Sequence, residues 1–302
     1  MHNNPLQKRV VFDFEVDFSN GGGIQGQDFR LDIDGDDIAD EALAAYIVQD
    51  MRLLMVGAVR ILNKQIISEP HKRLSTQTPA TEFQLIDLSH TIEEGMITYK
   101  GLPAPIICDF LSREASRKIY APGTEFHIGK IEMVANTGTY LDSPFHRYAD
   151  GKDLSDLDLK TVANLDGVIV HATNRTGRAI TQAAFEGLDL RGKALLVRTG
   201  WDQHWRTDQY FEGHPFLTAE AAAYLVEAGV ALVGIDSLNI DDITGGERPV
   251  HSTLLGQEIL IVEHLCNLDQ IPTGPFRFYA VPVKIKSFGT FPVRAFARVD
   301  PP

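Results

Sequence analysis

The sequence predicts an α/β fold for its larger part and a small α+β domain before it. Two observations predict this. From residue 83 onward, short apolar runs bounded by Gly, Asp or Ser follow one another with few helical segments between them, which is typical of buried strands. Before residue 74, alternation of apolar and acidic residues indicates strands, and one longer segment has helical spacing.

The N-terminal domain, residues 1–74, is expected to begin with a strand. Apolar and acidic residues alternate from Val11 to Phe18, S-N-G-G-G offers a turn that tolerates positive φ, and F-R-L-D-I resumes the alternation. This pattern predicts an antiparallel pair. Apolar residues then keep a helical spacing from about Ile38 to Asn63, with Asp36 or Asp37 as the N-cap, which predicts one helix.

Residues 75–82 form the predicted linker. The segment L-S-T-Q-T-P-A-T-E has small polar residues and a proline between two periodic regions. The main domain is therefore expected to span residues 83–302. Within it, apolar runs at 85–89, 131–135, 167–171, 194–200 and 231–236 predict buried strands. Thr218 as N-cap, Glu220 in the first turn and Gly229 at the end predict a helix.

Composition indicates a globular protein and argues against several kinds of partner. Of the 302 residues, 44% are apolar and 23% charged, which is ordinary for a globular domain. The net charge of −13 argues against nucleic acid or an anionic membrane surface, because both attract clustered Lys and Arg. We therefore expect no nucleic-acid partner and no membrane partner.

Cysteine usage and the first segment predict a cytoplasmic protein. Cys108 and Cys266 are far apart and form no C-x-x-C pair, so neither a disulfide framework nor a cysteine zinc site is expected. The chain begins with charges and glycines instead of the apolar stretch of a signal peptide. No run approaches the roughly 20 apolar residues of a membrane-spanning helix.

Two segments carry residues suited to chemistry. N-T-G-T-Y-L-D-S-P-F-H, from Asn136 to His146, places Asp142 and His146 after a turn, a combination suited to a metal ligand beside a general base. Alone, this pattern more often gives a turn-capping Asp and a surface His. A second segment, H-S-T-L-L-G-Q-E-I-L-I-V-E, supplies His251 and Glu263, and the two segments together favour a catalytic site.

The two segments resemble the cyclase family that includes bacterial kynurenine formamidase and isatin hydrolase. The family pattern is H-x-G-T-H-x-D-x-P-x-H, followed far downstream by His and Glu. I-D-L-S-H-T-I, L-L-V-R-T-G-W and V-G-I-D-S agree with it in order. The resemblance covers residues 83–302 and implies the swivelling β/β/α fold, with Asp142, His251 and Glu263 as metal ligands and His146 as general acid or base.

The chain departs from that pattern at two positions. Asn136 and Tyr140 stand where the family has two metal-binding histidines, and amide and phenol oxygens are poorer zinc ligands than imidazole. Three outcomes follow. One divalent metal, zinc or manganese, binds at Asp142, His251 and Glu263; or the site is metal-free, with His146 activating water and Tyr140 and Asn136 donating to an oxyanion; or the protein is inactive. We favour the single metal.

The predicted function is hydrolysis of a small cyclic or acyl amide or ester, at a C–N or C–O bond, as by a formamidase, imidase or lactonase. The alternative is a noncatalytic ligand-binding or regulatory protein. The expected partner is a small-molecule substrate, and the resemblance implies a homodimer or homotetramer. Residues 1–80 are expected to reinforce that oligomer or to cover the pocket.

Further residues near these segments stay unassigned. His90 and His127 can reach the site, but a structural or exposed histidine is the commoner case. Arg147 suits a carboxylate, although a salt bridge within the protein is as frequent. Trp201 and Trp205 suit an aromatic substrate, yet core packing is the ordinary role of such residues.

Overall fold

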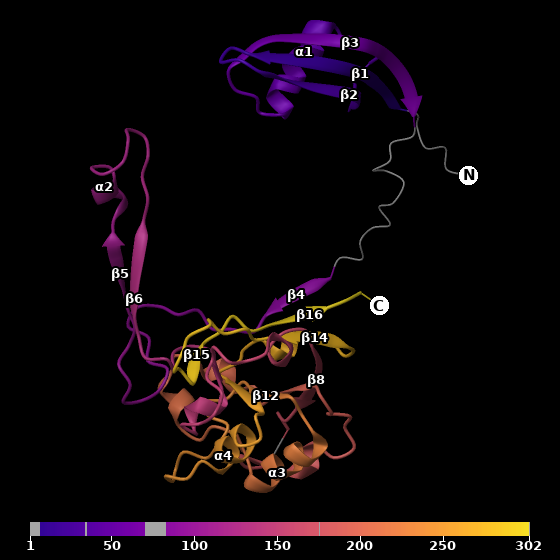
Figure 1. Cartoon of the computed structure of the whole chain (residues 1–302). Helices are drawn as coiled ribbons and strands as arrows, with labels where there is room; N and C mark the ends of the chain where they lie inside the picture. Colours follow the sequence, from indigo (N-terminus) through magenta and orange to yellow (C-terminus); the bar gives the residue numbers. More distant parts are fainter. Residues whose placement is uncertain (1–6, 34, 70–82, 175, 302) are drawn as a thin grey trace. The chain divides into compact units, whose positions relative to one another are not determined.

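The computed structural model describes residues 7–33, 35–69, 83–174 and 176–301. The chain divides into two compact units, Met1–Thr81 and Glu82–Pro302 (Figure 1). The predicted linker at 75–82 lies outside the described residues, so its conformation stays a prediction. Each unit is described by itself.

The N-terminal unit is a three-stranded antiparallel sheet with one helix. Its elements are β1 (Gln7–Phe18), β2 (Gly23–Asp32), α1 (Asp40–Asp50) and β3 (Val56–Glu69), and the strand order is β2-β1-β3. The central strand β1 pairs antiparallel with both neighbours. Apolar residues from alternate positions of β1 pack with two residues of α1, and these are Val10, Phe12, Phe14, Val16, Leu43 and Ile47. The predicted hairpin is confirmed.

The predicted long helix is wrong in its second half. Helix α1 ends at Asp50, and Val56–Glu69 form strand β3. Two non-glycine residues between them, Arg52 and Met55, have φ of 50° and 59°, so the chain leaves the helical conformation there. The spacing of the apolar residues in this segment fits a helix as well as a strand. Pairing with β1 along most of its length decides the outcome, because a helix without tertiary packing is only marginally stable.

The main unit is built on a nine-stranded mixed sheet, as the predicted α/β class requires. The strand order is β15-β7-β13-β12-β10-β8-β14-β16-β4. The strands are β4 (Gln84–Asp87), β7 (Tyr140–Asp142), β8 (Leu165–His171), β10 (Ala194–Arg198), β12 (Leu232–Ile235), β13 (Leu260–Glu263), β14 (Phe276–Tyr279), β15 (Thr290–Pro292) and β16 (Phe296–Val299).

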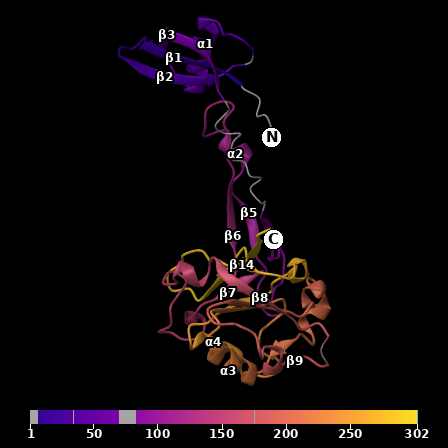
Figure 2. The same cartoon turned by 90° about the vertical axis from the view of Figure 1, so that its right-hand side faces the viewer.

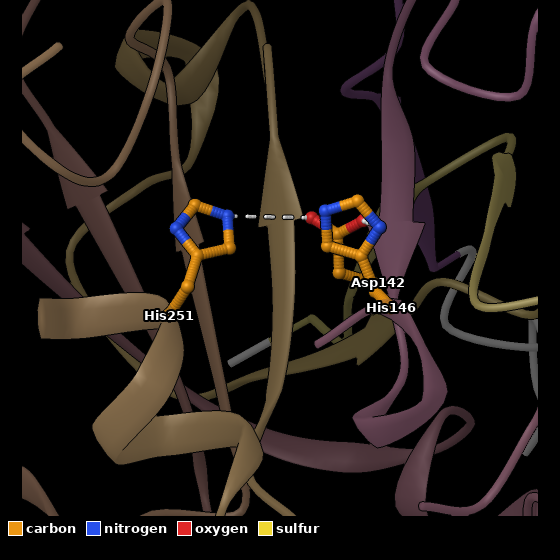
Figure 3. Close-up of side chains that lie close together, drawn as sticks. All are labelled: Asp142, His146 and His251. Atoms are coloured by element: carbon orange, nitrogen blue, oxygen red, sulfur yellow. Dashed lines mark ion pairs between the residues drawn. The ribbon is translucent and has the colours of Figure 1, made fainter. Parts of the chain in front are cut away.

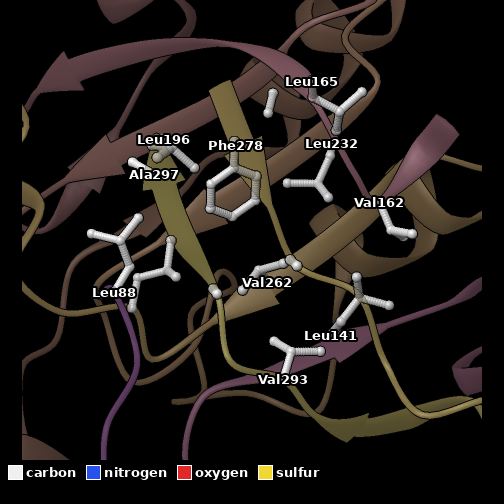
Figure 4. Packing of buried hydrophobic residues seen from close by; sticks show 14 of the residues in the cluster. Leu88, Leu141, Val162, Leu165, Leu196, Leu232, Val262, Phe278, Val293 and Ala297 are labelled. Carbon is white, nitrogen blue, oxygen red and sulfur yellow. The ribbon is translucent and has the colours of Figure 1, made fainter. Parts of the chain in front are cut away.

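The four central strands, β8, β10, β12 and β13, run parallel, and antiparallel strands flank them. One face of this sheet packs against a core that includes Leu88, Leu141, Leu196, Val262 and Phe278 (Figure 4). A second core contains alternate residues of the same strands together with helices α3 (Ala219–Ala228) and α4 (Pro249–Leu255). A sheet buried on both faces explains why its strands are continuously apolar.

Helix α3 confirms the helix that the sequence predicts. The Thr218 hydroxyl accepts a hydrogen bond from the backbone N–H of Ala221, and Gly229 ends the helix with φ of 73°.

Among the described residues no helix is both long and apolar enough to cross a bilayer. The described part of the main unit also contains six 3-10 helices, which are η1 (Pro144–His146), η2 (Leu159–Thr161), η3 (Gln182–Ala184), η4 (Trp201–His204), η5 (Asp208–Phe211) and η6 (Leu268–Gln270).

Two further pairs of strands stand apart from the main sheet. β9 (Ala179–Ile180) pairs with β11 (Phe216–Leu217), and β5 (Ile106–Leu111) pairs with β6 (Ile128–Glu132). The β5–β6 hairpin, with α2 (Arg113–Ser116) between its strands, extends away from the main sheet (Figure 2). We call residues 106–132 the arm. The buried strand predicted at 131–135 is therefore wrong, because β6 ends at Glu132 and all its residues are exposed.

Candidate active site

Strand pairing brings four site residues together at the β15-β7-β13 edge of the main sheet. Glu263 on β13 lies opposite Tyr140 on β7, and Thr290 on β15 lies opposite Asp142. Side chains alternate along a strand, so Tyr140 and Asp142 share one face while Leu141 enters the core on the other. Residues far apart in the chain thus become neighbours through the register of three short strands.

Two histidines approach this edge from elements outside the sheet. His146 ends η1, the 3-10 turn that Pro144 begins directly after β7. His251 lies in α4. The chain before β15 passes close to His146, because a Cβ on Gly289 would stand 2.3 Å from the His146 backbone nitrogen. Only glycine permits this approach at position 289.

Asp142, His146 and His251 form a group that can hold a metal ion, because one ligand atom of each lies within 4.8 Å of the others (Figure 3). His251 Nε2 lies 3.7 Å from Asp142 Oδ2, and His146 Nδ1 lies 3.7 Å from Asp142 Oδ1. Glu263 Oε1 is 3.6 Å from His251 Nε2. Ligands that each lie about 2.1 Å from one tetrahedral metal are about 3.4 Å apart, so these spacings resemble those of a metal site.

Asp241 orients His251 so that its second ring nitrogen faces the carboxylates. Asp241 Oδ2 lies 2.6 Å from His251 Nδ1 and also accepts a hydrogen bond from the His251 backbone N–H. Its other oxygen accepts from the Val250 N–H. Asp241 is fully buried, so the ring is held firmly. A carboxylate behind a histidine is the usual support of a metal-binding imidazole.

The carboxylates around His251 favour a bound cation. Burial opposes protonation of His251, but the neighbouring carboxylates of Asp142, Asp241 and Glu263 raise its pKa to about 10. Burial raises the pKa of Glu263. Asp142 Oδ2 is buried and has no hydrogen-bond partner among the described atoms. Three carboxylates around one imidazole, one oxygen of them unpartnered, therefore fit a divalent metal.

Thr290 connects Asp142 with His146. Its hydroxyl donates to Asp142 Oδ1 and lies 2.7 Å from His146 Nδ1. A hydroxyl has one proton, and an ionised carboxylate only accepts, so the Thr290 oxygen accepts the Nδ1–H of His146. The Nε2 of His146 then keeps its lone pair. The His146 side chain is 35% exposed and lines the adjacent cavity, so this nitrogen can meet a substrate.

Tyr140 acts as a buried donor to Glu263. Its hydroxyl donates to Glu263 Oε2 at 2.7 Å and lies 3.3 Å from His264 Nε2, while His264 Nδ1 is 2.8 Å from the Tyr210 hydroxyl. Burial lowers the pKa of His264 to about 3, so this ring is neutral. It has a single N–H and can donate to only one of the two tyrosine hydroxyls. Burial, and then the charge of Glu263, raises the pKa of Tyr140, which stays a phenol. Asn136 also bonds Tyr140.

The reacting groups open into a cavity of about 560 Å³. Its lining residues are His146, Arg147, Asn239, Gly246, Glu247, Arg248, Pro249, His251 and Ser252. The cavity is large enough for a small organic substrate. Both histidines of the candidate metal group therefore face the same space.

The structure brings together all six site residues that the sequence predicts, which are Asn136, Tyr140, Asp142, His146, His251 and Glu263. His127 instead lies on the arm and bonds Asp109. His90 stacks on Trp205 with ring centroids 3.9 Å apart. Sequence reasoning missed Thr290 and Asp241, which are single polar residues within ordinary loop and strand composition and carry no motif.

Comparisons with known proteins agree on one family. The model of the family described as "Putative cyclase" matches residues 86–242. Kynurenine formamidase of Bacillus mycoides (strain KBAB4) is 30% identical over 217 residues, which are 71% of this chain and 97% of that protein. The matched part includes most of the main domain.

Solved structures confirm the predicted cyclase-like fold. A protein described as a "predicted metal-dependent hydrolase" from Bacillus stearothermophilus is 26% identical, with a TM-score of 0.57, over 72% of this chain and 98% of its own. Isatin hydrolase A of Labrenzia aggregata, bound to benzyl benzoate, has a TM-score of 0.63 at 20% identity, over 76% of this chain and 98% of its own. At that identity the second likeness shows the fold alone.

Proposed function

Because the chain belongs to the cyclase family, we propose that it is a hydrolase that adds water to the carbonyl carbon of a small cyclic or acyl amide or ester. The observation that carries this is the convergence of two buried carboxylates with two histidines that line one cavity, with His146 Nε2 free to take a proton. The likeness to kynurenine formamidase supports an aryl formamide as the first substrate class to test.

Asp142, His251 and Glu263 would hold one zinc or manganese ion. Asp142 Oδ2 has no hydrogen-bond partner among the described residues, and His251 Nε2 lies 3.7 Å from this oxygen and 3.6 Å from Glu263 Oε1. When bound, such an ion polarises a carbonyl oxygen and lowers the pKa of water. Tyr140 bonds Asn136 and donates to Glu263, which supports one metal in place of two.

His146 carries the proton steps. With Nδ1–H bonded to Thr290, His146 Nε2 takes a proton from the attacking water as the water oxygen adds to the carbonyl carbon. The same nitrogen then gives that proton to the leaving nitrogen or oxygen as the tetrahedral intermediate collapses. Thr290 holds the imidazole in one tautomer and one orientation through both steps, because its own hydroxyl proton stays hydrogen-bonded to Asp142.

Tyr140 argues against the metal-free alternative. Its single proton points to Glu263, so it has none left for a developing oxyanion while that bond persists. Its role in this mechanism is to hold Glu263 in place. The noncatalytic alternative stays open to a direct test, because it requires ligand binding without any turnover.

Metal content and turnover measured together test the function. We expect about one zinc or manganese ion per chain by inductively coupled plasma mass spectrometry, and its loss in Asp142→Ala/His251→Ala. Asp150→Ala/His171→Ala, two exposed residues of the same types, is the matched control and should keep the metal. His146→Ala should keep the metal and lose at least about a hundredfold in kcat. Absence of turnover on aryl formamides, cyclic imides and lactones by the metal-loaded wild type would refute the hydrolase.

A further inference from the structure

Arg248 places an unpaired positive charge beside the reacting groups. It immediately precedes α4, the helix that carries His251, and both residues line the cavity. Arg248 Nη1 donates to the backbone carbonyls of Gly245 at 2.9 Å and Glu247 at 2.6 Å. These bonds fix the guanidinium without neutralising it, because a carbonyl carries no net charge.

No carboxylate in the described part of the chain takes up this charge. Among the residues that the structure describes, no Asp or Glu side chain lies within ion-pair distance of Arg248. The neighbouring acid, Asp242, pairs instead with Arg178 at 3.2 Å. Glu247 lines the cavity, but only its backbone oxygen contacts Arg248. The chain has a net charge of −13, and Arg277, for comparison, pairs with Asp166 at 2.8 Å.

A second arginine, Arg147, follows His146 directly in the chain. Arg147 lines the same cavity, donates through Nε to the Ser252 hydroxyl at 3.1 Å and lies over the Tyr148 ring at 5.3 Å. Within the described part of the chain it has no carboxylate partner either. The cavity wall thus presents two guanidinium groups, each anchored by neutral atoms, next to the histidines that would act on the substrate.

We infer that the substrate carries a carboxylate that binds Arg248, with Arg147 adding to the positive field, while its amide or ester carbonyl lies at Asp142, His146 and His251. This rests on the proposed hydrolase function and names its substrate class. A guanidinium binds a carboxylate through parallel hydrogen bonds, and a partly buried one held in place does so with little loss of side-chain freedom. The unpaired charges also offset the repulsion that a strongly acidic protein exerts on an anion.

Matched substrates test this class. We would compare 2-, 3- and 4-formamidobenzoate with the corresponding formamidobenzamides, which differ only in replacing the carboxylate by a neutral amide. For the preferred isomer we expect kcat/KM at least tenfold higher for the acid. Arg248→Met should raise KM for the acid about 10- to 100-fold and leave KM for the amide within about twofold, and Arg248→Lys should fall between. Arg277→Met, a control outside the cavity, should change neither.

Binding to a non-hydrolysing variant separates this inference from the hydrolase function. In His146→Ala, calorimetric titration should give tighter binding of the acid than of the amide, and Arg248→Met should remove the difference. Equal kcat/KM for acids and amides would overturn the carboxylate site and leave the hydrolase standing. No turnover with Arg248-dependent binding of the acid would retain the site and refute the hydrolase. If no acid is turned over and no acid binds, the carboxylate site is overturned.

Discussion

Thr290→Val isolates the contribution of one hydroxyl to catalysis. Valine keeps the shape of threonine, so β15 and its pairing with β7 should persist. The substitution removes the proton donated to Asp142 Oδ1 and the acceptor for His146 Nδ1–H. Both partners remain, and Asp142 is fully buried. The imidazole then loses the contact that fixes its tautomer and its orientation.

The expected loss follows from the strength of such bonds. A hydrogen bond to a charged group contributes about 1.5–3 kcal/mol. At about 1.36 kcal/mol per factor of ten, its loss in the transition state lowers kcat roughly 10- to 150-fold. The effect should fall on kcat more than on KM, since Thr290 is not among the residues that line the cavity.

Steady-state kinetics on the best-cleaved aryl formamide, with metal content measured on the same samples, is the assay. Thr290→Ser keeps the hydroxyl and loses one methyl group, so it should retain most of the wild-type kcat. A Thr290→Val enzyme with normal metal content and kcat within about twofold of wild type would refute the role given to Thr290. Loss in Thr290→Ser as large as in Thr290→Val would point to packing instead.

Three further predictions concern stability and assembly. Tyr140→Phe strips Glu263 of a buried donor and should lower the free energy of unfolding by about 1–3 kcal/mol. Burial lowers the pKa of His90 from 6.5 to about 4, so the unfolded chain binds this proton first and stability falls as pH drops below 6.5. Between pH 6.5 and 5, His90→Phe should therefore lose about 1.6 kcal/mol less of its free energy of unfolding than wild type. We expect a homodimer or homotetramer joined through the arm, and Phe110→Asp/Ile119→Asp, at positions 75% and 66% exposed, should reduce the mass to that of a smaller species.

Each of these has its own control. Urea unfolding followed by tryptophan fluorescence reports the main domain alone, because Trp201 and Trp205 both lie there. Tyr224→Phe removes a hydroxyl with only a 3.5 Å contact and should cost little, so an equal loss would contradict the role of Tyr140. Parallel pH curves for wild type and His90→Phe would contradict the pH argument. For the arm, Leu159→Asp is a matched exposed control, and unchanged light-scattering mass in the arm variant would refute the contact.

The sequence by itself determined the features that depend on neighbouring residues. The caps of α3, Thr218 and Gly229, act within one turn of the helix they bound, so local pattern predicts them. The central strands are buried on both faces and are therefore continuously apolar, so a local pattern predicts them as well. Asp142 and His146 share one turn, and the motif around them carries the family resemblance.

Tertiary structure alone decided what depends on pairing between distant segments. Val56–Glu69 form a strand and not the end of a helix because they pair with β1. This pairing between distant segments is not encoded in local propensity. Thr290 reached Asp142 and His146 only through the β7–β15 register, across more than a hundred residues of chain. Arg248 stands out because no acid among the described residues lies within ion-pair distance of it, and charge balance in space cannot be read from charge order along a chain.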